Sequence, residues 1–175
     1  MIPLIDCATP DDAPAIHALV ESAYRGDAAR RGWTHEADLL GGQRTDIAAI
    51  AAIIASRDAR ILVARGDAGP MASVVVERKS DTVVYLGMLA VDPARQTGGL
   101  GKTMIAAAEA VGRDVFAATT MEMTVIERRT ELIAYYRRRG FEPTGERRPF
   151  PYDDPAFGIP KSRDLDFIVL AKPLR

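Results

Sequence analysis

A glycine-rich turn between an apolar strand and a helix holds the residues best suited to do chemistry. It reads Gln96-Thr97-Gly98-Gly99-Leu100-Gly101-Lys102-Thr103, just after Pro93 ends the strand. The first N–H groups of a helix lack backbone partners and carry partial positive charge, so they suit a phosphate or pyrophosphate. Glycines let an anion reach the backbone because no Cβ stands in the way. The turn therefore predicts a ligand that carries phosphate groups.

One interpretation of this turn is a nucleotide-binding P-loop. Gly101-Lys102-Thr103 matches the end of the pattern G-x-x-x-x-G-K-[ST]. The first glycine of that pattern falls at residue 96, which is Gln96, and no later apolar strand ends in an obvious magnesium-binding aspartate. The match to a P-loop therefore fails at its first glycine, and a plain glycine-rich turn without a ligand is the other alternative.

The turn also resembles the pyrophosphate loop of the GNAT superfamily of N-acetyltransferases, Q/R-x-x-G-x-G/A. Gln96, Gly99 and Gly101 occupy its fixed positions, and Ala90-Val91-Asp92-Pro93 resembles the phrase that precedes it. Further along, the segment from Tyr136 to Gly140-Phe141 resembles the helix end Tyr-x-x-x-Gly-Phe of the same superfamily. The two motifs follow in the family's order, and the resemblance covers essentially the whole chain, residues 1–175, as one acetyltransferase domain.

The resemblance implies an α/β fold of GNAT type. Its central sheet would be mixed and mostly antiparallel, with two parallel strands that splay apart, and helices would flank it. Acetyl-CoA would be the donor substrate, bound in the splay and at the glycine-rich turn. The residues expected to contact it are Leu89, Ala90, Val91, Gln96, Thr97, Gly98, Gly99, Leu100, Gly101, Lys102 and Thr103.

By the same resemblance, an acetyl group would move directly from acetyl-CoA to a primary amine through a tetrahedral intermediate. A backbone N–H near Leu89 would stabilise the oxyanion. Tyr136 matches the residue that protonates the departing thiolate; its other interpretation is a core tyrosine on an apolar face with Leu132. Tyr135 is offset by one position from the motif and is the weaker candidate.

The general base is the open part of this mechanism. Some members carry a glutamate where this chain has Tyr85, and the strand 82–91 holds no carboxylate. Glu122 and Glu36 are the candidates, and a water relay is the alternative. Glu122 could equally lie on the solvated face of an alternating strand.

The same resemblance implies that the segment 25–44 walls the acceptor site, with Trp33, Glu36 and Tyr85 as the expected substrate-binding residues. Arg25 and Arg44 are candidates for binding an acceptor carboxylate. Parts of this segment resemble a bacterial GNAT subgroup with poorly defined acceptors. The acceptor is expected to be a small-molecule amine or a peptide, and a GNAT-like fold that senses acyl-CoA without transfer is an alternative. A homodimer is left open.

The elements that must position these residues follow from periodicity. Apolar residues three and four apart predict a helix that ends near Gly26, a helix after Asp46 with Ile47, Ile50, Ala51 and Ile54 on one face, and helices over 100–111 and 131–139. Strands are expected over 4–5, 61–64, 72–77, 82–91, 119–125, 144–148 and 167–171. This order of elements indicates a mixed α/β fold around a central sheet.

Composition restricts the function classes. The formal net charge of −1 gives no bulk field for nucleic acid, so no nucleic-acid partner is expected. Cys7 is the single cysteine, which excludes an internal disulfide, and it is expected to be small and buried. His17 and His35 lack partners at metal spacing, so no metal is predicted. Residues 1–6 do not resemble a secretory leader, and no apolar run is long enough to span a membrane. A cytoplasmic protein without a membrane partner is therefore expected.

Overall fold

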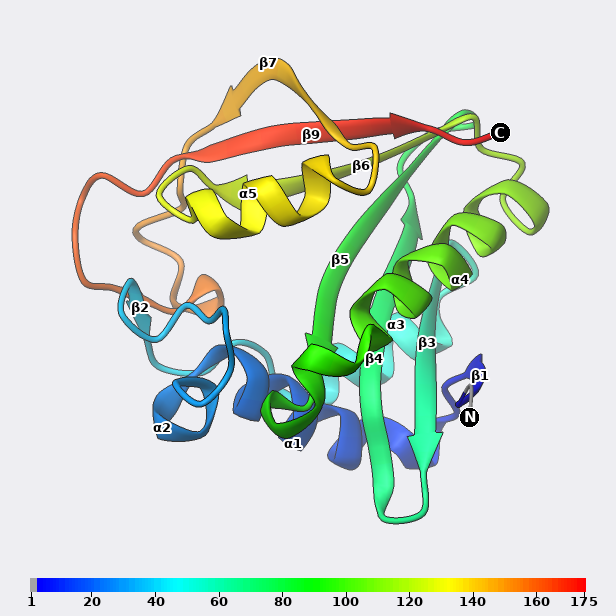
Figure 1. Cartoon of the computed structure of the whole chain (residues 1–175), viewed down its shortest axis with the longest axis horizontal. Coiled ribbons are helices and arrows are strands. Elements are labelled where there is room, and N and C mark those ends of the chain that lie inside the picture. The colour runs from blue at the N-terminus through cyan, green and yellow to red at the C-terminus, as the bar shows by residue number, and fades with distance from the viewer. Residues whose placement is uncertain (1–2) are drawn as a thin grey trace.

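A seven-stranded sheet forms the centre of the molecule (Figure 1). The computed structural model describes residues 3–175, so the first two residues of the N-terminal stretch considered above lie outside it. The strand order is β1-β3-β4-β5-β6-β9-β7, and only β5 and β6 run parallel. The strands are β1 Leu4–Cys7, β3 Ala59–Gly66, β4 Gly69–Arg78, β5 Val83–Val91, β6 Thr120–Ile126, β7 Glu142–Arg148 and β9 Phe167–Pro173. The predicted mixed, mostly antiparallel sheet is confirmed.

The parallel pair β5–β6 separates after a short stretch. Val83, Val84 and Tyr85 pair with Thr120, Met121 and Glu122, and no further pair follows. Figure 1 shows the two strands diverging toward their C-terminal ends. The divergence leaves side chains and backbone groups of both strands facing a gap that other elements must line.

Strand β5 is irregular at the edge of this gap. Its pairing with β4 shifts register between Ser73 and Val75, and Met88 has a φ of 42°. Left-handed backbone is uncommon for residues other than glycine and signals a local constraint. The hydroxyl of Tyr24 donates a hydrogen bond to the carbonyl oxygen of Leu89 at 2.7 Å, which fixes the bulged strand to the first helix.

Helices cover both faces of the sheet. Helices α1 Ala13–Tyr24 and α3 Ile47–Ala55 pack on one face, and α4 Leu100–Asp114 and α5 Thr130–Arg137 cover the other. Their starts follow from local sequence: Thr9 and Asp12 form a capping box before α1, and the Asp46 side chain accepts the Ala49 N–H at the start of α3. Burying each large apolar side chain stabilises the fold by about 1.5–3 kcal/mol.

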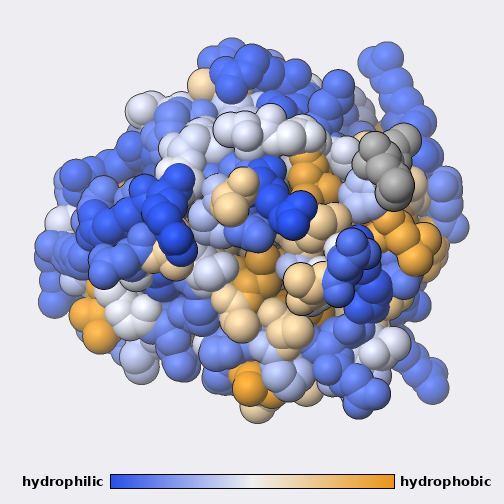
Figure 2. Space-filling model, turned by 60° about the horizontal axis from the view of Figure 1, so that its bottom comes forward, coloured by the Kyte–Doolittle hydropathy of each residue, from blue (hydrophilic) through white to orange (hydrophobic). Residues whose placement is uncertain are grey.

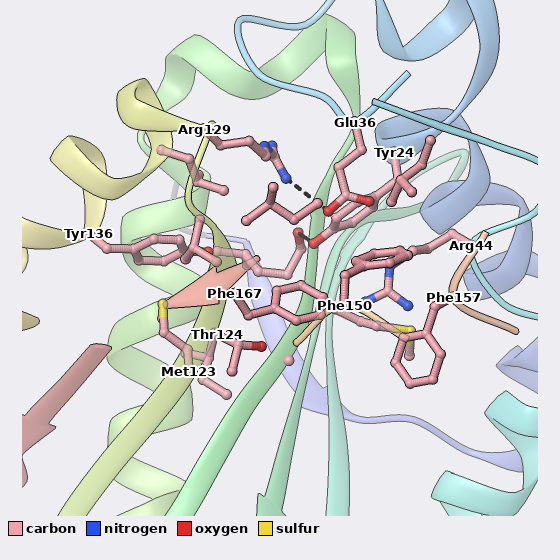
Figure 3. A pocket seen from close by; sticks show the side chains of 18 of the residues that line it. Tyr24, Glu36, Arg44, Met123, Thr124, Arg129, Tyr136, Phe150, Phe157 and Phe167 are labelled. Carbon is pink, nitrogen blue, oxygen red and sulfur yellow. Dashed lines mark hydrogen bonds and ion pairs between the residues drawn. The ribbon is translucent and has the colours of Figure 1, made fainter. Parts of the chain in front are cut away.

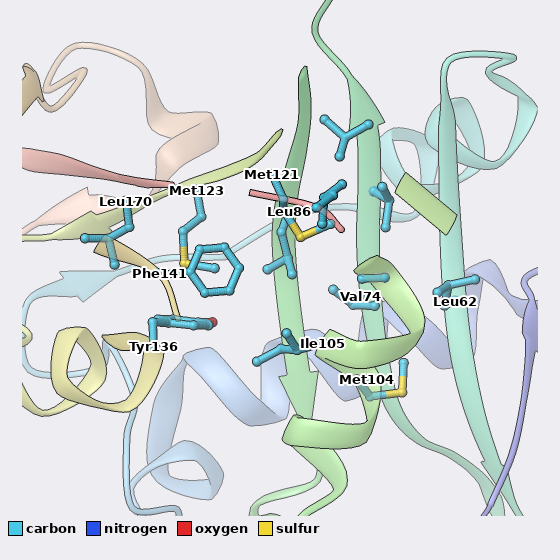
Figure 4. Close-up of a cluster of buried hydrophobic side chains, with 14 of the residues drawn as sticks. Leu62, Val74, Leu86, Met104, Ile105, Met121, Met123, Tyr136, Phe141 and Leu170 are labelled. Carbon is cyan, nitrogen blue, oxygen red and sulfur yellow. The ribbon is translucent and has the colours of Figure 1, made fainter. Parts of the chain in front are cut away.

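The core beneath α4 and α5 explains why these helices hold their positions (Figure 4). Met104 and Ile105 of α4 pack with Leu62, Val74 and Leu86 of the sheet. Tyr136 and Phe141 fill the space between α5 and strand β6, with their rings edge to face at 5.8 Å. The C-terminal end of α5 is thus anchored in the core.

The predicted apolar face of α3 is only partly buried, and the predicted burial of Cys7 was wrong. Ile47 is 47% exposed because it is the first residue of α3, and the helix reaches the core only at Ile50. Cys7 is exposed because β1 is the outermost strand of the sheet and turns this side chain to solvent.

Two elements had no sequence signal. The short helix α2 spans Gly26–Ala29, and a two-stranded ladder joins β2, Leu40–Gly41, to β8, Ile159–Pro160. Lys161 extends the ladder, because its N–H donates to the Leu39 carbonyl at 2.9 Å and its Nζ to the Ala37 carbonyl at 2.6 Å. The segment 25–44 and the proline-rich loop 149–163 therefore form one connected wall.

The surface is mostly hydrophilic on the side that carries α1, with scattered hydrophobic patches (Figure 2). Among residues 3–175, no helix combines the length and apolar character that crossing a membrane requires.

Candidate active site

Two pockets meet at the side chain of Tyr136. The first, here called the splay pocket, lies where β5 and β6 diverge; its lining includes Tyr85, Leu89, Thr124, Arg129, Tyr136 and Phe167 (Figure 3). The second, here called the loop pocket, is lined by Val91, Gln96 and Gly101 together with Trp33, Tyr135 and Tyr136. Tyr24, Leu89, Arg129, Leu132 and Tyr136 line both, so the two pockets form neighbouring parts of one site.

The glycine-rich turn has the geometry of an anion site. Gly99 caps α4 in left-handed conformation, with a φ of 75° and no side-chain cap. The Thr103 N–H donates to the Gly99 carbonyl, so the amides of Leu100, Gly101 and Lys102 precede the first helical hydrogen bond. A Cβ at Gly98 or Gly99 would have no atom within 4 Å. This open space beside unpaired amides fits the phosphates of the predicted acetyl-CoA.

The side chain of Gln96 ties this turn to the acceptor segment. Its Nε2 donates to the Val91 carbonyl at 3.3 Å, and its Oε1 accepts the Trp33 N–H at 2.9 Å. The Trp33 ring, 43% exposed, lies 5.1 Å from the Tyr135 ring. Trp33 therefore lines the loop pocket and is neither a core anchor nor part of the splay pocket.

Tyr136 is 6% exposed and lies at the junction of the two pockets. Within the described part of the chain its hydroxyl makes no hydrogen bond. Burial raises the pKa of Tyr136, chiefly because the charged phenolate would lose its hydration. The hydroxyl is thus a protonated group facing the site. Burial also raises the pKa of Tyr135, whose ring stacks under the Arg139 guanidinium.

Two candidate residues lie on the parallel strands: Tyr85 lines the site and Glu122 lies outside it. The Tyr85 hydroxyl lies 2.6 Å from the Thr124 hydroxyl, and both residues line the splay pocket. Glu122 lines neither pocket; its carboxylate lies 3.3 Å from Nη2 of Arg148. The reason is position: Glu122 pairs with Tyr85 at the closed end, before the strands part.

Glu36 lies in the splay pocket on the side of Arg129 (Figure 3), and two buried arginines hold it. Nη1 of Arg25 lies 2.5 Å from one carboxylate oxygen, and Nη1 of Arg129 lies 3.0 Å from the other. Burial acts to raise the pKa of Glu36, but the charges of Arg129, Arg44 and Arg25 outweigh it and lower the pKa. Glu36 is therefore a carboxylate with both oxygens engaged, which is a weak proton acceptor.

Sequence reasoning did not find the partners of Glu36. Arg129 stands 93 residues away along the chain, and it also donates to the Thr34 hydroxyl at 2.7 Å. No local pattern connects residues so far apart. Tyr24 was also missed as a site residue, although an aromatic next to Arg25 at the end of an apolar helix face offered a signal.

No metal is expected from these side chains. Within residues 3–175, no group of three or more histidine, cysteine or acidic side chains is placed to hold an ion.

Comparison with known proteins identifies the fold. The family model for the acetyltransferase (GNAT) domain matches residues 57–143, from just before β3 to the start of β7. No curated protein is significantly similar in sequence.

Solved structures resemble the whole chain. Ard1 from Thermoplasma volcanium has a TM-score of 0.74 and 15% identity, covering 100% of this chain and 99% of that one. A ribosomal-protein-alanine N-acetyltransferase from Brucella melitensis has a TM-score of 0.71 and 19% identity, with coverage of 98% and 99%. For yncA from Salmonella typhimurium, solved with its cofactor acetyl-CoA, the values are 0.71 and 18%, with coverage of 99% and 94%. At such identities the likeness shows the fold, and together with the family model it means that this chain belongs to the GNAT acetyltransferase superfamily.

Proposed function

We propose that this chain is a single-domain N-acetyltransferase that moves an acetyl group from acetyl-CoA to a primary amine. The observation that carries the proposal is the junction at Tyr136, where the pocket beside the open glycine-rich turn meets the pocket between the splayed strands. A donor held at the turn and an acceptor held in the splay would then meet beside one protonated hydroxyl. A P-loop is not supported, because the sheet is mostly antiparallel.

The proposed reaction uses few groups of the protein. The amides that follow Gly99 bind the pyrophosphate, and the backbone N–H near Leu89 stabilises the oxyanion of the tetrahedral intermediate. As the new N–C bond forms and the C–S bond breaks, Tyr136 gives its proton to the departing sulfur. The bond from Tyr24 to the Leu89 carbonyl holds the bulged strand in place.

The proton of the amine has no strong acceptor in the splay pocket. Glu36 is its only carboxylate among the described residues, and its oxygens are bound to Arg25 and Arg129. We therefore propose a water relay, with the hydroxyl pair of Tyr85 and Thr124 as its protein end. The positive charges around Glu36 favour the neutral form of a bound amine, which reduces the need for a base.

Calorimetric titration of the purified protein, followed by an assay of thiol release with amines, tests this function. We expect acetyl-CoA to bind and ATP with magnesium not to bind, and free CoA to appear when an amine is added. Binding of ATP with magnesium without any response to acetyl-CoA would contradict the proposal.

A substitution at Gly98 tests the phosphate site without disturbing the fold. Gly98 lacks a positive φ and a Cβ there meets nothing within 4 Å, so Gly98→Val should leave the melting temperature unchanged. We expect acetyl-CoA affinity to fall about tenfold, because the new side chain fills the space of the phosphates. A tenfold loss corresponds to about 1.4 kcal/mol of binding free energy. Gly41→Ala, remote from α4 and with only ordinary contacts, is the matched control and should bind normally. Equal affinity in both variants would place the pyrophosphate elsewhere.

A second candidate is an acyl-CoA sensor without transferase activity. It is favoured by one observation, that the single carboxylate of the splay pocket in the described chain is neutralised by arginines. It predicts acetyl-CoA binding with no thiol release for any amine.

A further inference from the structure

The splay pocket carries an excess of positive charge. Three arginines line it, Arg25, Arg44 and Arg129, against the single carboxylate of Glu36. Arg25 and Arg129 are 6% and 5% exposed, and both are committed to Glu36. Two other acids lie close to these arginines without lining either pocket: Glu131, 48% exposed and 4.0 Å from Nε of Arg129, and Glu21, which accepts the backbone N–H of Arg44 at 2.7 Å. The pocket therefore holds about two more positive charges than negative ones.

The buried arginines are also short of hydrogen-bond acceptors. Nε and Nη2 of Arg25 and Nε of Arg129 are buried without a partner within residues 3–175. Buried donors without acceptors are costly, and native proteins rarely leave them so. These donors belong to two residues that line the splay pocket, where an anionic group would offset the charge that Glu36 alone balances.

Arg44 is the arginine that is free to bind such a group. None of the described carboxylates lies within salt-bridge distance of it, and its guanidinium lies 5.2 Å from the centre of the Tyr24 ring. Figure 3 shows this guanidinium pointing into the pocket, near Phe157. A guanidinium suits a carboxylate because its planar N–H donors match both oxygens at once.

From these observations we infer that the acceptor is an amine that also carries a carboxylate, and that Arg44 selects it by binding the carboxylate. The apolar lining from Leu40, Phe150, Phe157 and Phe167 would hold the apolar side chain of an amino acid whose α-carbon carries both the amine and the carboxylate. Polyamines would be repelled by the same arginines. This inference rests on the proposed acetyltransferase function and adds the chemical class of its acceptor.

Matched amine pairs test the selection. L-phenylalanine and L-leucine are compared with their carboxamides, and spermidine serves as a polycation. The amino group of a carboxamide is less basic than that of the acid, so a larger fraction of it is neutral and able to attack at neutral pH. A preference for the acids would therefore run against intrinsic reactivity. We expect kcat/KM to favour the acids by about 10- to 100-fold, as for loss of a charged hydrogen-bond pair. We expect Arg44→Gln to reduce that ratio to near one by lowering the acids alone, and Arg44→Lys to restore part of it.

Binding to the protein–CoA complex separates this inference from the proposed function. Calorimetry with L-phenylalanine and CoA-loaded protein should show affinity that Arg44→Gln abolishes and that the carboxamide lacks. Such binding without any thiol release would support the acceptor class and contradict the transferase. Turnover of spermidine or the carboxamides as fast as the acids would support the transferase and overturn the acceptor class. An equal loss for acids and amides in Arg44→Gln would also overturn it.

Discussion

Replacing Tyr136 by phenylalanine should lower kcat about 100-fold while acetyl-CoA affinity and stability change little. The ring would still pack against Phe141, and the lost hydroxyl has no hydrogen bond to break within residues 3–175. The loss in rate follows because the departing thiolate would have no proton donor, and general acid catalysis contributes about 10²–10⁴-fold. Steady-state kinetics, calorimetry with acetyl-CoA and a thermal melt measure the three quantities.

The matched control is Tyr135→Phe. Tyr135 is the neighbouring tyrosine, but it faces Trp33 and Arg139 and lines only the loop pocket. We expect its kcat to stay within about threefold of the wild type, because the acid in the proposal is not this group. An unchanged rate in Tyr136→Phe with a large loss in Tyr135→Phe would assign the role of general acid to Tyr135.

The pH dependence of the wild type gives an independent check on the acid. Because burial raises the pKa of Tyr136, its proton is kept well into alkaline conditions. The rate should therefore rise as the acceptor amine loses its proton and should not fall again below about pH 10, the ordinary pKa of tyrosine. A descending limb between pH 7 and 9 would assign the acid to a different group.

Removal of the Glu36 carboxylate should destabilise the protein by about 3–5 kcal/mol. Glu36→Ala leaves Arg25 and Arg129 buried beside each other without a counter-charge. For a chain of this length, the melting temperature should fall by about 10 °C. Chemical denaturation and thermal melts measure both values.

The pH dependence of this loss has a definite sign. The pKa of Glu36 is lowered below its usual 4.5 in the folded state, so its stabilisation is complete above about pH 4.5 and is lost as pH falls further. The difference in unfolding free energy between the wild type and Glu36→Gln should therefore be constant from pH 7 to 5 and shrink below that. If Glu36 were instead the general base, Glu36→Gln would fold normally and lose the acid limb of its pH–rate profile.

Local patterns in the sequence were enough for the strands, the main helices and the glycine-rich turn. The proposed phosphate site could be predicted because it consists of consecutive residues, Gln96 to Thr103, whose backbone amides would bind the phosphates. Only part of the acceptor side could be predicted from the sequence. Glu36 and Arg44 could be named, but the pairing of Glu36 with Arg129 depends on how distant segments pack, and nothing near either residue encodes it.

The position of Glu122 also depends on packing that local sequence patterns do not show. Alternation placed it on β6, but whether it faced the cleft depended on where β5 and β6 part, directly after the pair of Tyr85 with Glu122. The register shift between β4 and β5 and the contact of Tyr24 with Leu89 lie just beyond that point, and the composition of β5 and β6 predicts neither.

The ladder between β2 and β8 has a consequence for the rate of turnover. It ties the segment with Glu36 and Arg44 to the loop with Phe150 and Phe157, so two stretches more than a hundred residues apart form one wall of the site. Short ladders of this kind have little independent stability, and such units open cooperatively. Acceptor entry and product departure would then share a single gate, and the opening rate of that gate would set an upper limit on turnover however fast the chemistry becomes.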